Sequence, residues 1–237
     1  AANWSAIPMT DDGSGNDLLA GDFVFTATVP AAVQTHRRLV RYRIAFADAA
    51  GTGATVPYPD DEQPNFAWFV HNGAPAWTGS LVPGGPTTTF PATLLDDISA
   101  CHLVANQTDV INSQYNGSFN GVHMLGTLVH DGAVYDHIEF ENRGEASTYV
   151  SGKNKWRIHF NRARALRLRD NLGRPYQSAW NRMNLEGCSC PWAAVHRGMA
   201  GVEEAVSYRL YQLCGVPSPR TRYLHFRVVD NPHEADP

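Results

Sequence analysis

The sequence has little lysine: Lys153 and Lys155 are the only two lysines among its 237 residues. It has no apolar run near the length of a membrane-spanning helix, and its first residues show no signal-peptide pattern. The formal net charge of -4 provides no basic excess that would attract nucleic acid or an anionic membrane surface. We therefore expect no nucleic-acid partner and no membrane span.

Several catalytic motifs are also absent. The sequence contains no Gly-x-Ser-x-Gly elbow of a serine hydrolase, no Walker phosphate loop and no Rossmann glycine fingerprint. A Cys-x-x-Cys-His haem attachment sequence is missing too. What the sequence does contain is a hydrophobic fraction of 43%, which is enough to bury a core and excludes a disordered chain.

Four cysteines are present: Cys101, Cys188, Cys190 and Cys214. Four cysteines allow three disulfide pairings, and the spacing does not choose among them. The even cysteine count and the low lysine content favour an exported protein, either secreted or at the cell surface. The alternatives are buried free thiols and a zinc site at Cys188, Cys190 and His196, although structural zinc usually uses wider cysteine spacing.

The patterns predict an α+β, β-rich fold in three parts. Residues 1–75 carry short alternating runs at 23–29, 40–46 and 66–71, separated by Gly, Pro and Asp, which indicates part of an immunoglobulin-like sandwich. In the second run Arg41 and Arg43 are expected to point outward. Residues 76–121 are predicted to be a linker and irregular loop, and residues 122–237 a lobe of sheet and helix.

An acid-rich loop lies in the first part of the chain. Its oxygen ligands form a candidate calcium site, but the spacing fails the EF-hand template because the glycine and the terminal bidentate acid are missing. The alternative is that these side chains cap their own turns. The candidate ligands are Asp11, Asp12, Asn16, Asp17 and Asp22.

The third part combines strands with one helix. Trp156, Ile158 and Phe160 alternate with Arg157 and His159, which predicts a strand, and similar runs occur at 134–140 and 223–229. Apolar residues at helical spacing predict one buried helix face over 202–213, ended by Gly215 and Pro217. Glu203 and Glu204 begin this helix, and we expect the basic strand at 153–157 to face them. The apolar positions of the helix are Val202, Val206, Leu210 and Leu213.

Two resemblances add to this interpretation. The sequence from Trp4 to Thr26 resembles the immunoglobulin-like domain that precedes the kinase-like part of many large secreted bacterial proteins. The stretches VYDHIEFENRGEAST, GKNKWRIHF, MNLEG and GVEEAVSYRLYQLCGVPSPRTRYLHFRV follow in the order of the CotH family. That family comprises atypical kinases of spore coats and related secreted proteins. The second match covers roughly residues 120–229 and corresponds to the amino-terminal half of the family.

The CotH resemblance implies a kinase-like small lobe that binds ATP with Mg²⁺, because phosphoryl transfer depends on positioning and charge neutralisation. Carried over by position, Lys153, Arg157 and Arg143 become candidate phosphate-side residues, and Glu204 becomes the helix acid that orients them. Glu145 departs from the family, which has Asn there. The catalytic and magnesium-binding aspartates of the family belong to its second half, so the resemblance implies that this chain alone is not catalytic.

Two functions follow as expectations. The first is a fragment of a secreted CotH-like protein, whose complete parent binds ATP and phosphorylates exported proteins, with the rest of that parent as its partner. The second is an extracellular structural or adhesive piece that assembles with other chains through exposed β edges. Simpler interpretations of the same residues are a solvated strand face for Lys153, Lys155 and Arg157, and dipole-complementing surface acids for Glu203 and Glu204.

Overall fold

A mixed seven-stranded sheet is the main feature of the computed structural model, which describes residues 4–80, 85–113, 121–143, 155–187, 202–230 and 234–235. Its strand order is β11-β10-β9-β8-β7-β12-β13, with β12 parallel to β7 and the other pairs antiparallel. The β-rich α+β class is therefore confirmed. The strands are β7 (Ala100–Ala105), β8 (Met124–His130), β9 (Ala133–Asn142), β10 (Trp156–His159), β11 (Arg182–Leu185), β12 (His225–Val229) and β13 (Glu234–Ala235).

One face of this sheet carries the apolar core. Trp156, Ile158 and Phe160 are all buried, as the alternation in β10 predicts, while Arg157 and His159 are only partly covered. The same cluster takes in Phe140 of β9 and Leu128 of β8. Alternation along three neighbouring strands therefore builds a single apolar layer.

A bulge in β9 changes which of its residues face the core. Leu128 pairs with Tyr135 and Gly126 pairs with Ile138, so two residues of β9 stand opposite Thr127. This extra residue puts Tyr135 and Ile138 together in the core cluster, whereas the alternation in the sequence separates them. His137 in the bulge has φ 54, in the left-handed region.

The segment predicted as linker and loop contains ordered elements. Helix α1 (Ala92–Leu95) precedes β7, and helix α2 (Gln107–Ser113) follows it. The loop prediction was wrong for 107–113, because the Asn106 side chain accepts a hydrogen bond from the Thr108 amide (2.9 Å) in the manner of a helix N-cap. The Ser113 hydroxyl accepts a hydrogen bond from the Trp156 indole (3.1 Å), which joins α2 to the core.

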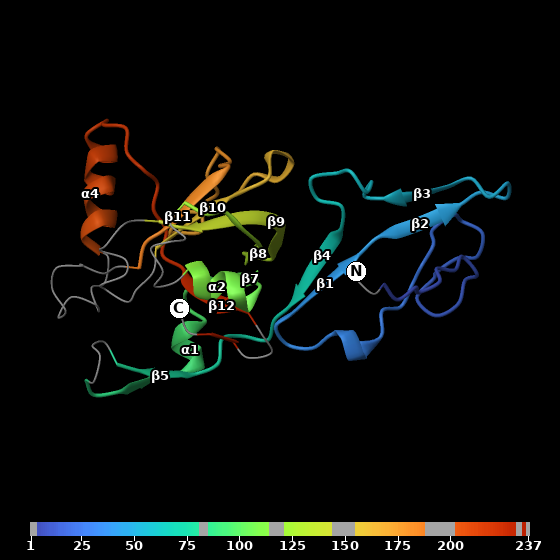
Figure 1. Cartoon of the computed structure of the whole chain (residues 1–237), viewed down its shortest axis with the longest axis horizontal. Helices are drawn as coiled ribbons and strands as arrows, with labels where there is room; N and C mark the ends of the chain where they lie inside the picture. The colour runs from blue at the N-terminus through green and yellow to red at the C-terminus, as the bar shows by residue number, and fades with distance from the viewer. Residues whose placement is uncertain are drawn as a thin grey trace.

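Three two-stranded ribbons lie outside the sheet, and the two formed within residues 38–70 project from one side of it in Figure 1. The predicted strands at 40–46 and 66–71 are present with shifted ends, but 23–29 is not a strand and has only an isolated bridge between Thr10 and Thr26. In this segment Phe23 has φ 66, and no second layer among the described residues covers Phe23 and Phe25, which are 85% and 56% exposed. The elements are η1 (Ala31–Val33), β1 (Arg38–Tyr42), β2 (Ile44–Ala47), β3 (Gly53–Val56), β4 (Phe66–Val70), β5 (Trp77–Gly79) and β6 (Thr88–Phe90), with pairs β1–β4, β2–β3 and β5–β6.

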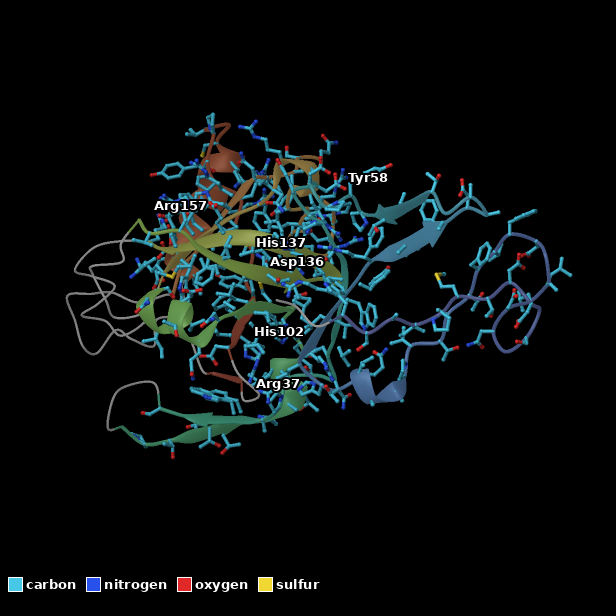
Figure 2. The ribbon with its side chains drawn as sticks, turned by 45° about the vertical axis from the view of Figure 1, so that its right-hand side comes forward. Arg37, Tyr58, His102, Asp136, His137 and Arg157 are labelled. Atoms are coloured by element: carbon cyan, nitrogen blue, oxygen red, sulfur yellow. The ribbon has the colours of Figure 1, made fainter. Side chains whose placement is uncertain are left out.

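A partly buried salt bridge helps to attach the ribbons to the sheet. Arg41 of β1 donates two hydrogen bonds of 2.7 Å to the carboxylate of Asp136 in the β9 bulge, and one of 3.0 Å to Thr127. Asp136 and His137 lie on β9 at the side of the sheet that meets the ribbons (Figure 2). Arg41 therefore points into the sheet contact rather than outward, which corrects the sequence-based expectation.

Helix α4 (Val202–Leu213) has the predicted bounds and ends at Gly215, whose φ is 77. It stands at the side of the sheet away from the ribbons (Figure 1). The prediction of a buried face was wrong, because Val206 is 48% and Leu210 56% exposed. Helical periodicity identifies an apolar stripe but not what covers it. None of the described helices is long and apolar enough to cross a membrane.

Candidate functional site

A pocket of about 550 Å³ lies between α4 and the core face of the sheet. Its apolar floor includes Trp156 and Phe226, whose rings lie 5.1 Å apart. Its charged lining consists of four arginines and two glutamates, which leaves a formal excess of two positive charges. These are Arg143, Arg182, Arg220, Arg222, Glu186 and Glu204.

Glu186 lines the pocket and pairs with two basic side chains, of which Arg143 also lines the pocket. It follows β11 directly, and its carboxylate pairs with Arg143 and, at 2.8 Å, with the Lys155 ammonium. All three side chains are partly covered, with 21–33% of their surface exposed. Lys155 and Glu186 were not among the candidate site residues, although Glu186 lies in the MNLEG stretch that carries the resemblance.

Glu204 lies on the α4 wall of the same pocket. Its carboxylate accepts a hydrogen bond of 2.9 Å from the Tyr208 hydroxyl one turn along the helix. That bond raises the pKa of Tyr208, while the positive charge of Arg143 opposes the rise. Arg143 and Glu204 therefore line the same pocket, as the CotH resemblance implies, but Arg143 and Lys155 form their ion pairs with Glu186.

Arg157 lies on the opposite face of the sheet. Its neighbour Trp156 faces the pocket, so strand alternation turns Arg157 away from it. There Arg157 donates hydrogen bonds to Glu141 (3.0 Å) and Asn184 (3.3 Å). The structure thus brings together two of the four predicted nucleotide-side residues and places Arg157 elsewhere. The fourth, Lys153, lies outside the described residues, as does Glu145.

The acid-rich loop forms a second candidate site. Carboxylate oxygens of Asp11, Asp17 and Asp22 come within 4.8 Å of one another, so three of the five predicted calcium ligands are grouped. These carboxylates also accept backbone hydrogen bonds, for example Asp11 from Gly21 (2.7 Å). Turn capping therefore accounts for the loop without an ion. Calcium binding stays a prediction, which a melting curve with and without calcium will check.

The described cysteines are free thiols. Cys101 is completely buried in β7, and burial raises the pKa of its thiol to about 12. Cys214 is exposed just beyond α4. Cys188 and Cys190, with the zinc alternative at His196, lie outside the described residues.

Comparisons with protein-family models, with curated proteins and with solved structures found no match.

Proposed function

We propose that the sheet and α4 form the nucleotide-binding lobe of a secreted CotH-like kinase, preceded by part of an immunoglobulin-like domain. The complete parent would bind ATP with Mg²⁺ and phosphorylate exported proteins. Over residues 120–229 the resemblance provides positioning groups and no magnesium-binding aspartates. The proposal for this chain is therefore nucleotide binding without phosphoryl transfer.

The observation that carries the proposal is the composition of the pocket. An apolar, aromatic floor at Trp156 and Phe226 suits a purine base. Arginines in excess over glutamates suit a triphosphate, because guanidinium groups bind phosphate oxygens in pairs. Glu186 holds Arg143 at the wall and Lys155 behind its own carboxylate, which reduces the ordering cost when an anion replaces that carboxylate.

The test is calorimetric titration of the chain with ATP in the presence of Mg²⁺. We expect saturable binding that Arg143→Gln weakens about tenfold or more, since it removes a charge-assisted phosphate contact, and that Lys155→Gln weakens less, since Lys155 adjoins the pocket only through Glu186. Arg157→Gln is the matched control, because this arginine lies on the other face of the sheet and should leave ATP binding unchanged. Absence of binding, or equal losses in all three variants, contradicts the proposal.

A second candidate function is assembly with other chains through residues 4–80. The two-stranded ribbons leave strand edges unpaired, and Leu18 (95% exposed) and Phe23 (85% exposed) project into solvent. Sedimentation of the chain should then show a concentration-dependent oligomer that Leu18→Ser together with Phe23→Ser dissociates. A monomer at all concentrations contradicts this function and leaves the nucleotide proposal untouched.

A further inference from the structure

Two histidines and a glutamate meet on the sheet face opposite the pocket. Ligand atoms of His123, Glu141 and His159 all lie within 4.8 Å of one another. His123 directly precedes β8, Glu141 lies on β9 and His159 lies on β10. The register places them together, because Met124 pairs with Phe140 and Arg157 pairs with Glu141. No local sequence pattern indicates this cluster, since its members come from three separate segments.

The spacing of the three side chains suits a single metal ion. The His159 Nε2 atom lies 3.0 Å from Glu141 Oε1, and the His123 Nε2 atom lies 3.8 Å from Glu141 Oε2. Ligands bound at about 2.0–2.2 Å to one tetrahedral ion are separated by roughly 3.4 Å. These two separations, one to each Glu141 oxygen, bracket that value. The third separation, between the ligand atoms of the two histidines, is within 4.8 Å.

A further carboxylate orients one of the histidines. Glu139 Oε2 lies 2.6 Å from His123 Nδ1 and accepts a hydrogen bond from it when that nitrogen carries the proton. This bond fixes the tautomer that leaves the lone pair on Nε2, the atom aimed at Glu141. Metal-ligating histidines are held by carboxylates in this way. The arrangement gives the trio an outer supporting contact at His123.

The Glu141 side chain carries the negative charge that a metal ligand needs. Burial raises the pKa of this carboxyl, but hydrogen bonds and charge from His159 and Arg157 outweigh burial and hold the pKa below its ordinary value. Glu141 is therefore ionised at neutral pH. The Arg157 guanidinium, 3.0 Å from Glu141 Oε1, neutralises the carboxylate and competes with a cation for it.

We propose that His123, Glu141 and His159 bind one divalent transition-metal ion, of which Zn²⁺ fits best, with the fourth position open to water. Two imidazoles disfavour Ca²⁺ and Mg²⁺, which take oxygen ligands. A bound ion would link the residue before β8 to β10 across β9. The site lies on the sheet face away from the nucleotide pocket and does not depend on the kinase proposal.

The first experiment is calorimetric titration with Zn²⁺ at neutral pH, together with melting curves. We expect one ion per chain and a raised melting temperature. His123→Gln and His159→Gln should each lower the affinity at least about 100-fold, because each removes a ligand. Glu139→Gln should lower it about 10–100-fold by releasing the His123 ring. His137→Gln, which changes a β9 histidine outside the trio, should leave the affinity unchanged.

Arg157→Gln should raise the Zn²⁺ affinity, whereas the ligand variants lower it. Removing the competing positive charge from Glu141 should raise the Zn²⁺ affinity about tenfold, whereas a purely structural hydrogen-bond network predicts lower stability and no gain in affinity. Cys188→Ser with Cys190→Ser should leave binding intact. Loss of binding in that double variant assigns the ion to the thiols and overturns the proposal. Unaltered binding in His123→Gln and His159→Gln overturns it as well.

Discussion

The sheet region (residues 100–230) and the ribbon region (residues 4–80) share a sequence pattern but differ in burial. In the sheet region the apolar positions of β8, β9 and β10 meet in one core, where Phe140 is 0% exposed. Among the described residues of the ribbon region, only Asp17 and Ala74 are buried. An alternating sequence is therefore not sufficient for a buried sheet. The apolar face of a strand contributes to stability only where a second layer of side chains covers it.

The largest expected effect compares equivalent truncations in the two regions. Phe140→Ala removes a fully buried ring and should lower the free energy of unfolding by about 3–5 kcal/mol. Phe23→Ala removes a ring that is 85% exposed and should change it by less than about 0.5 kcal/mol. Urea unfolding of both variants measures the difference. A cost at Phe23 similar to that at Phe140 would show that the ribbon region has a cover of its own, such as another chain.

The second prediction concerns the salt bridge that joins the two regions. Burial disfavours ionisation of Asp136, but hydrogen bonds from Arg41 and Thr127 outweigh it and lower the pKa of this carboxyl. Asp136→Asn should therefore cost about 2–3 kcal/mol at neutral pH, because it weakens two charge-assisted bonds and removes the carboxylate that neutralises Arg41. The carboxylate contribution is present above the unfolded-state pKa near 3.9 and is lost as the pH falls through the lower folded-state pKa.

Limited proteolysis checks where this effect acts. With Asp136→Asn, the β1–β4 ribbon should be cleaved faster than the sheet, because its attachment is weakened. Arg174→Gln is a suitable control, since it breaks an exposed salt bridge with Asp170 and should alter neither stability nor cleavage. Equal protection of the ribbon in wild type and Asp136→Asn would mean that other contacts hold the two regions together.

Much of the sheet region could be predicted from sequence because its local patterns and its tertiary environment agree. The core face of β10, and α4 with its end at Gly215, follow directly from spacing. The contacts between distant segments could not be predicted from local sequence patterns. The β9 bulge moves Tyr135 into the core. Arg143 and Lys155 form ion pairs with Glu186 rather than with Glu204. Such partners depend on register between distant strands, which no local pattern encodes.

The third prediction uses a histidine at the contact between the regions. His102 of β7 is 3% exposed, and its ring lies 4.4 Å from that of His71, just beyond β4. Burial, together with the smaller effect of the neighbouring charges of His71, Arg227, His225 and His36, lowers the pKa of His102 to about 3. The unfolded chain, with a histidine pKa near 6.5, binds a proton that the folded chain excludes.

Stability should therefore fall as the pH drops below about 6.5. At pH 5.5 this one group accounts for a loss of about 1.4 kcal/mol relative to pH 8. His102→Phe removes the titrating group and should flatten this part of the pH profile, as measured by urea unfolding at each pH. An identical profile in the variant would show that His102 is already protonated in the folded protein or that other groups dominate.

The smallest expected effect concerns α4, which belongs to the sheet region but resembles the ribbons in exposure. Leu210 is 56% exposed although it lies on the apolar stripe of the helix. Leu210→Ser should change the free energy of unfolding by less than about 0.5 kcal/mol, because little apolar area is withdrawn from water at this position. Leu166→Ser, which alters a leucine that is 1% exposed in the core, provides the contrast and should cost several kcal/mol. A loss of about 2 kcal/mol or more of unfolding free energy in Leu210→Ser would mean that the stripe is covered in solution. The apolar residues of α4 would then be buried like those of the sheet, not exposed like those of the ribbons.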